Sequence, residues 1–349
     1  MLITLTAPAF AETWYIENGD ITVKASGTEG KNTVSQGNKK DVEDTNTIIT
    51  NQNKDIASSN TVTIEANDKN DKVEVTLKDV NIDTSSRNKA AVSVTGEGDT
   101  NIKLDGDNAL KSDIYRSGIY GSGSLTISGG ENDSLTAQGG SGANGISSSG
   151  SLTISGGMVT ATGGDSTGSY SSGGYGIYSS GVTISGGSTV TANGGSGKDG
   201  SGDGIFSFDP VAISGGTVTA NGGDSKDGYG GDGIRSDGGV TISGNTVNAA
   251  GGNGGKVGGY GICSFDRVAI SGGTVNAAGG DGGNGKDGGN GIISRNIDLS
   301  GSLELTAKAG SPNGKALSQD GNELDLNTIK DKLGPGAKVT ATDANGDSK

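Results

Sequence analysis

Residues 204–220 read Gly-Ile-Phe-Ser-Phe-Asp-Pro-Val-Ala-Ile-Ser-Gly-Gly-Thr-Val-Thr-Ala, which are short strand-like segments separated by turn residues. In the second segment Val211 and Ile213 would point inward, and in the third Val218 would, because successive side chains alternate across a strand. Glycine at the corners supplies the backbone angles that other residues avoid. The stretch predicts one triangular coil of a parallel β-helix.

The same pattern recurs along most of the chain. A Gly-Ile pair begins at residues 118, 145, 176, 204, 233, 261 and 291, at spacings of 27 to 31 residues. Self-similarity at such a period indicates a solenoid, in which each repeat packs only against its neighbours. Coils stack at the strand spacing of about 4.8 Å, so residues about 28 apart become neighbours. We therefore predict an all-β, right-handed parallel β-helix with three short strands per coil of about 28 residues.

The composition excludes several other classes. The chain has 349 residues, of which 69 are glycine, 30% are hydrophobic and 4% are aromatic. No Gly-X-Y period runs through it, which excludes collagen. The net charge of −14 disfavours nucleic acid and anionic membranes as partners. The chain has no histidine and one cysteine, Cys263, so the commonest general base and an internal disulfide are both missing. We predict that the protein is not an enzyme.

The chain divides into four predicted segments. Residues 1–11 end in Ala-Phe-Ala and resemble the end of a secretory signal peptide. Residues 12–60 are expected to form an N-terminal cap with the first irregular coils, and residues 61–318 the parallel β-helix. Residues 319–349 would supply a C-terminal cap, with a short helix at 324–333, and a tail. No apolar stretch reaches 18 residues, so we expect no membrane insertion. We also expect a monomer that a bacterium secretes or holds at its surface.

Part of the sequence is similar to a known family. Residues 75–82 (Val-Thr-Leu-Lys-Asp-Val-Asn-Ile) and 89–92 (Lys-Ala-Ala-Val), with the later Gly-Ile-x-Ser and Leu-Thr-Ile-Ser-Gly-Gly coils, resemble a bacterial family of carbohydrate-binding β-helical proteins. The resemblance covers roughly residues 60 to 310. It implies a secreted or cell-surface protein that binds plant-type polysaccharides, including acidic ones, and that carries calcium.

The position after each Gly-Ile pair forms one outward column of side chains. The column consists of Tyr120, Ser147, Tyr178, Phe206, Arg235, Cys263 and Ile293. Tyr178 and Phe206 should lie one coil apart, and an exposed aromatic strip can stack on the apolar faces of sugar rings. The alternative is that these rings only stabilise the sheet across strands.

A second candidate for glycan binding lies in the glycine-rich loops. Tyr170 and Tyr229 occupy equivalent loops, beside a predicted ridge of charged residues. The ridge consists of Lys198, Lys226, Lys256 and Lys286, with Asp199, Asp227 and Asp287. The alternative is an ordinary solvated surface, in which exposed charges contribute little.

Acidic residues form two further columns. Asp203 and Asp232 directly precede Gly-Ile pairs, whereas Asp224 and Asp281 follow the glycine pairs that end the third strands. Stacked carboxylates repel one another unless a cation or a donor lies between them, and ligand sets made only of oxygen suit Ca²⁺. Calcium is therefore the expected cofactor at these four residues. The alternative is hydrogen bonding of the aspartates to nearby backbone groups.

These features favour a non-catalytic, adhesin-like protein that binds polysaccharide through many equivalent contacts along a rigid rod. One rival is a structural surface protein or spacer that binds no glycan. Another is a polysaccharide lyase or hydrolase on the same fold, for which Arg235 beside Asp232 would be the residue to mutate. Paired threonines on the third strands are also a feature of ice-binding proteins, but Met158, Asn248 and Asn276 interrupt the rows of threonine.

Overall fold

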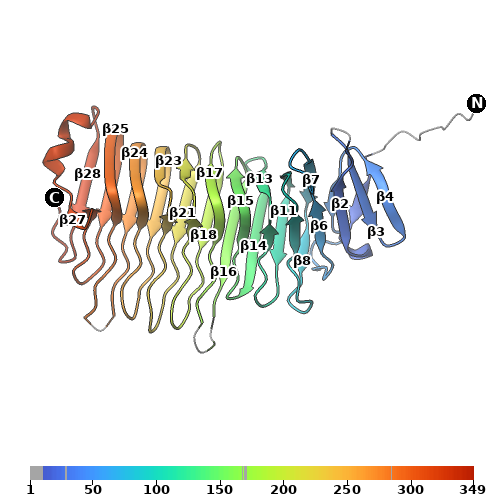
Figure 1. Cartoon of the computed structure of the whole chain (residues 1–349), viewed down its shortest axis with the longest axis horizontal. Coiled ribbons are helices and arrows are strands. Elements are labelled where there is room, and N and C mark those ends of the chain that lie inside the picture. Colours follow the sequence, from blue (N-terminus) through green and yellow to red (C-terminus); the bar gives the residue numbers. More distant parts are fainter. Residues whose placement is uncertain (1–10, 28–29, 167, 169–170, 284) are drawn as a thin grey trace, which may run out of the picture.

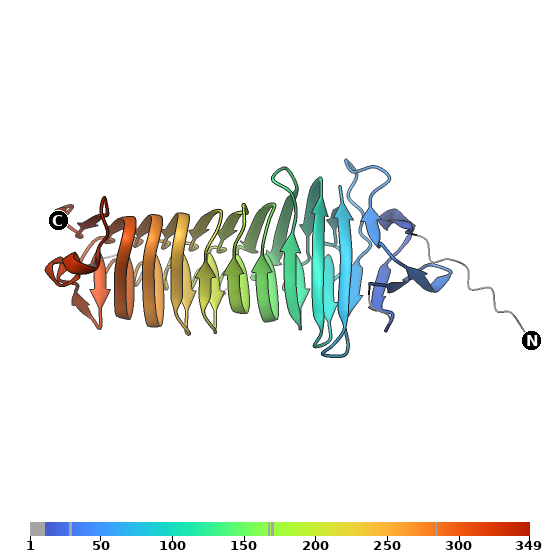
Figure 2. The same cartoon turned by 90° about the horizontal axis from the view of Figure 1, so that it is seen from above.

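The computed structural model describes residues 11–349 except 28, 29, 167, 169, 170 and 284. The chain is 53% strand and 3% helix and forms a β-solenoid of about ten stacked turns, each of roughly 28 residues. The strands run across a long rod whose N-terminal and C-terminal coils lie at opposite ends (Figures 1 and 2). The predicted fold class and period are confirmed.

Three columns of parallel strands run along the rod. The first, which carries the Gly-Ile pairs and which we call face 1, consists of β2 (Ile21–Ala25), β6 (Val62–Glu65), β9 (Val92–Thr95), β12 (Ile119–Gly121), the starts of β15 (Ile146–Ile154) and β17 (Ile177–Ile184), β19 (Ile205–Ser207), β22 (Ile234–Ser236), the starts of β24 (Ile262–Ala278) and β25 (Ile292–Lys308), and β26 (Leu317–Gln319). The second consists of β1 (Thr13–Tyr15), β5 (Ile48–Thr50), β7 (Lys72–Lys78), β10 (Asp99–Asp105), β13 (Ser124–Ser128), the ends of β15 and β17, β20 (Val211–Ile213), and parts of β23 (Val240–Ala250), β24 and β25. The third consists of β8 (Asn81–Asp83), β11 (Asp107–Lys111), β14 (Ser134–Ser141), β16 (Met158–Gly164), β18 (Thr189–Asn193), β21 (Thr217–Asn221), the ends of β23, β24 and β25, and β28 (Lys338–Thr342).

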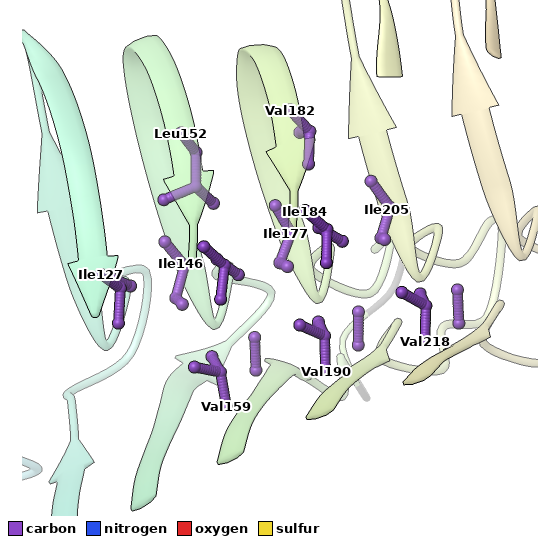
Figure 3. Packing of buried hydrophobic residues seen from close by; sticks show 14 of the residues in the cluster. Ile127, Ile146, Leu152, Val159, Ile177, Val182, Ile184, Val190, Ile205 and Val218 are labelled. Carbon is purple, nitrogen blue, oxygen red and sulfur yellow. The ribbon is translucent and has the colours of Figure 1, made fainter. Parts of the chain in front are cut away.

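Equivalent residues of successive coils pair in register. Ile205 pairs with Ile177 on one side and Ile234 on the other, and all three are fully buried. The interior is filled by such columns of isoleucine, valine, leucine and alanine (Figure 3). A narrow core lined by small branched side chains explains how a chain with few large apolar residues folds, because each coil buries its residues against the two beside it.

The described parts of the glycine-rich connections between the third and first columns have regular backbone hydrogen bonds. Each connection runs out from the rod and back to it as two extended, glycine-rich segments, which we call arms. All of these connections project from the same side of the rod (Figure 1). We call this double row the glycine fin. Its backbone hydrogen bonds zigzag from coil to coil: Gly202 N–H donates to Gly195 O, Gly223 N–H to Gly202 O and Gly231 N–H to Gly223 O, each at 2.9 Å. The fin explains the glycine content, because the arms approach too closely for side chains.

An antiparallel hairpin closes the N-terminal end of the rod. The hairpin pairs β2 with β3 (Asn32–Gln36) and β3 with β4 (Lys39–Asp44). Near it lies a short 3-10 helix, η1 (Ile16–Asn18). The buried Trp14 donates its indole N–H to Asp44 Oδ2 at 2.7 Å, which ties the hairpin to the first coil. Within residues 12–60, β1 and β2 already pair in parallel with later coils.

The C-terminal end is covered by a 3-10 helix, η2 (Leu326–Lys332), within the segment where a short closing helix was expected. Asp298 of β25 forms an ion pair with Lys332 of this helix and another with Arg267 of β24. After η2 the chain adds β28 to the third column, and Ala341 and Lys349 exchange backbone hydrogen bonds. The final residues are thus attached to the last coil and are not the free tail expected. A short two-residue strand, β27 (Asn322–Glu323), pairs with β26. Within the described residues, no helix has both the length and the apolar character needed to cross a membrane.

Candidate functional site

The outward column of face 1 has the predicted order. Tyr178 pairs with Phe206, Phe206 with Arg235 and Arg235 with Cys263. The rings of Tyr178 and Phe206 are stacked, with centroids 5.4 Å apart and planes inclined by 11°. Aromatic side chains one coil apart in sequence are therefore direct neighbours in space, as the period predicts.

The column is not the uniformly exposed strip that we expected. Phe206 is only 8% exposed, because the rings of Tyr175 and Phe208 pack against it at 5.3 and 5.0 Å. Cys263 is buried, and burial raises the pKa of its thiol, which stays protonated. Tyr120, by contrast, is 46% exposed. The prediction of exposure is wrong for Phe206, because neighbouring aromatic residues outside the column cover its ring.

A groove of about 640 Å³ lies over face 1 around Tyr120. Its floor is the outward side of consecutive strands in the first column, and its wall is formed by the connections that precede them. The floor residues are Thr63, Ser93, Tyr120 and Ser147, and the wall includes Asn88, Lys89, Tyr115, Arg116, Gly142 and Asn144. We call this hollow the Tyr120 groove.

Tyr115 stands in an unusual backbone conformation on the wall of the Tyr120 groove. The wall residues Asn88, Tyr115 and Gly142 all have left-handed φ angles, of 53°, 60° and 71°. Glycine and asparagine tolerate this region, whereas an aromatic residue is strained there by about 1 kcal/mol or more. Tyr115 is nevertheless 77% exposed, so burial of its ring does not repay the strain. Strain at an exposed ring beside a groove is typical of a functional position.

Two basic side chains lie in the same groove. Arg116 donates through Nε to Asn88 Oδ1 at 3.2 Å and makes no ion pair with any residue that the structure describes. Lys89 Nζ lies 3.0 Å from Asp20 Oδ2, an aspartate that Arg87 also contacts. The groove therefore combines two exposed tyrosines with an uncompensated guanidinium, although the chain as a whole is strongly acidic.

The aspartates before the Gly-Ile pairs are hydrogen-bonded between coils. Asp203 Oδ1 accepts from the backbone N–H of Asp232, and Asp232 Oδ1 accepts from that of Tyr260, both at 2.7 Å. Asn144 and Asn290 accept in the same way, at 2.9 and 2.8 Å, from the equivalent residue of the next coil. The structure thus has the backbone hydrogen bonding that we named as the alternative to a metal site.

The second acidic column forms a similar ladder. Asp224 Oδ1 accepts from the backbone N–H of Asn253 at 2.6 Å. Asn253 Oδ1 accepts from Asp281, and Asp281 Oδ1 from Ser311. These side chains bridge coils at the exposed root of the glycine fin.

Asp203 and Asp232 are buried, and their pKa values differ from those of exposed carboxylates. Burial and the neighbouring charge of Asp232 raise the pKa of Asp203 well above its usual range. Burial raises the pKa of Asp232 to about 6. Each of the two carboxylates also uses its Oδ1 atom to accept a backbone hydrogen bond from the next coil. Within the described part of the chain, no three acidic or thiol side chains cluster as metal ligands would.

Arg235 lies between two aromatic rings. Its Cζ is 5.6 Å from the ring centroid of Phe206 and 5.2 Å from that of Phe265, both within the range of cation–π interaction. Its Nε is buried without a hydrogen-bond partner among the described residues, and so is Oδ1 of Asp237 two residues later. This unpaired donor and acceptor are the unusual feature of the coil.

Tyr229, the loop candidate that the structure describes, does not line the Tyr120 groove. Tyr229 is exposed on the glycine fin, with Lys256 Nζ 5.7 Å from its ring centroid. Tyr170 falls outside the described residues. A second ridge residue, Asp287, accepts from Asn313 Nδ2 at 2.9 Å, and among the described residues no ion pair joins members of the predicted ridge.

Comparison with protein-family models, characterised proteins and solved structures finds no match. The likeness to the carbohydrate-binding β-helical family therefore remains a resemblance. The candidate site rests on this chain's own geometry.

Several residues of the site were not singled out from the sequence. They are Lys89, Tyr115, Arg116, Phe208 and Phe265. Aligning the coils on their corners would have placed Tyr115 between Asn88 and Gly142, at a position that otherwise holds residues suited to left-handed φ. The repeated Ser-Phe-Asp at residues 207–209 and 264–266 was the signal for the two phenylalanines.

Proposed function

We propose that the protein is a non-catalytic, adhesin-like polysaccharide-binding protein, secreted or held at a bacterial surface, and that a glycan chain lies in the Tyr120 groove. The observation that carries the proposal is Tyr115, an exposed aromatic ring in a strained backbone conformation beside Tyr120. Sugar rings present apolar C–H faces, which stack on tyrosine, and hydroxyl groups, which accept from a guanidinium such as that of Arg116. A linear polymer on a repetitive rod also gains affinity from several weak contacts made together.

Replacing Tyr115 by the residue that the preceding coil has at this position tests the proposal. Tyr115→Asn should leave the free energy of unfolding unchanged or raise it by about 1 kcal/mol, because asparagine tolerates the left-handed backbone. The same change should weaken glycan binding roughly tenfold through loss of one stacking surface. A glycan array identifies the polysaccharide, and calorimetry with it then measures the affinity.

Tyr15→Asn serves as the control, because Tyr15 is an exposed tyrosine on β1 that does not line the Tyr120 groove. Full affinity in Tyr115→Asn, or an array without any polysaccharide signal, would reject glycan binding in the groove. Incubation of the bound polysaccharide with the protein should release no reducing or unsaturated ends, and their appearance would reject the non-catalytic assignment.

Calcium binding stays a prediction for Asp203, Asp232, Asp224 and Asp281, of which Asp224 and Asp281 are exposed to solvent. If calcium bridges these carboxylates to an acidic glycan, binding to polygalacturonate should be present in calcium buffer and lost in EDTA. Equal binding in both buffers would remove calcium from the function.

A further inference from the structure

We propose that Phe208, Arg235, Asp237 and Phe265 form a second subsite, which binds an uncharged sugar unit of the same glycan chain. The inference rests on the proposed function and adds the direction of the chain and the kind of sugar bound. The glycan would run along the rod, across the strands of face 1, from the Tyr120 groove to this cluster.

The cluster is arranged over three successive coils. Ser207, Ser236 and Ser264 pair in register, and the next residues are Phe208, an aspartate and Phe265. Phe208 is 47% and Phe265 49% exposed, so two large apolar rings face solvent with the polar coil between them. Exposed aromatic rings at such spacing suit the flat faces of a sugar chain.

The middle coil supplies a donor and an acceptor that the protein does not use. Arg235 Nε and Asp237 Oδ1 are both buried without partners among the described residues. A buried polar group without a partner is unfavourable, and a ligand that pairs with it would recover that free energy. A hydroxyl group accepts from the N–H and donates to the carboxylate at once. A sugar hydroxyl therefore matches the chemistry of this pair, and the coils on either side carry Phe208 and Phe265.

The charges of this coil favour a neutral sugar. The carboxyl groups that face Arg235 are those of Asp203, Asp232 and Asp237. A uronate carboxylate placed among them would be repelled at neutral pH, since Asp232 and Asp237 together outweigh the single guanidinium. The Tyr120 groove differs, because its basic side chains outnumber the acidic ones that contact them. The two subsites would thus select different positions of a glycan chain.

The separation of the subsites sets the length of glycan needed. Tyr120 and Arg235 are four rungs apart in the paired column of face 1. At about 4.8 Å per rung this is about 19 Å along the rod. Tyr178, one coil before the buried Phe206, lies on this path and offers a partly exposed ring.

Native electrophoresis of the full chain in gels containing a polysaccharide tests the second subsite. The probes are hydroxyethylcellulose, xyloglucan and galactomannan, which are neutral, and polygalacturonate, which is acidic. Phe265→Ala should weaken retardation by neutral polysaccharide about tenfold and leave retardation by polygalacturonate unchanged. Arg235→Lys keeps the positive charge beside the buried aspartates but loses the planar Nε–H donor, and should have the same effect.

Met158→Ala is the control, because Met158 is an exposed apolar side chain on the third column. If Tyr115→Asn weakens retardation but Phe265→Ala and Arg235→Lys behave like Met158→Ala, the second subsite is wrong while the groove stands. If no probe retards the wild-type protein, glycan binding fails as a whole. Retardation by polygalacturonate alone, or its equal loss in Phe265→Ala, would overturn the assignment of a neutral sugar.

Discussion

Gly223→Ala is expected to lower the free energy of unfolding by about 3 kcal/mol or more, although it adds one methyl group to a surface connection. A Cβ at Gly223 would lie well under 3.0 Å from the carbonyl group of Gly195, in the neighbouring coil. Both groups are backbone, so no side chain can rotate away. Relief would require the arms of the glycine fin to separate, which breaks the bond from Gly223 N–H to Gly202 O. Urea unfolding followed by circular dichroism measures the loss.

Gly244→Ala is the matched control for this prediction. A Cβ at Gly244 meets nothing within 4 Å, and its backbone is not in the left-handed region. This substitution should be neutral or stabilise by up to about 1 kcal/mol, because alanine has less freedom in the unfolded chain. Equal unfolding midpoints for Gly223→Ala and wild type would show that the fin is not a close-packed part of the native structure.

Asp232→Asn is expected to stabilise the protein at neutral pH and to remove part of its pH dependence. Burial raises the pKa of Asp232 from 3.8 to about 6. Below pH 3.8 Asp232 is protonated in both the folded and the unfolded state, and it has no effect on stability. Between pH 4 and 6 the unfolded state releases this proton first, so stability falls with rising pH. The loss reaches about 3 kcal/mol at and above neutral pH, at 1.36 kcal/mol per pKa unit.

Asparagine should keep the hydrogen bond of this ladder, because Asn144 and Asn290 make it in other coils. The quantity to measure is the difference in unfolding free energy between Asp232→Asn and wild type at pH 4 and at pH 8. Asp20, Asp133 and Asp298, whose pKa values are lowered, contribute equally to both proteins and cancel in this difference. The difference should be near zero at pH 4 and favour the variant at pH 8. A variant less stable than wild type at pH 8 would contradict the prediction.

The fold could be predicted because its signals are local and repeated. The spacing of the Gly-Ile pairs fixes which residues become neighbours, and it correctly placed Tyr178 beside Phe206. The inward direction of Val211 and Ile213 followed from alternation within one strand. These features depend on backbone geometry that every coil shares, so one coil predicts the next.

The site was harder to predict because it depends on departures from the repeat. The burial of Phe206 comes from Phe208, whose position in the turn does not follow the strand alternation. The burial of Asp232 depends on the aromatic residues and connections around it, which the period does not describe. Tyr115 is notable only in three dimensions, through its φ angle and its exposed ring.

The in-register pairing of the coils has a consequence for how such a chain can change in length. Phe206 and Arg235 occupy equivalent positions on successive rungs. Deleting one complete repeat, from Phe206 to the residue before Arg235, would therefore bring together strands that already share the same register. The inner surfaces would still match, and the rod would shorten by about 4.8 Å. Gene duplication or loss of single repeats can therefore adjust the reach of the molecule without requiring a new hydrophobic interior.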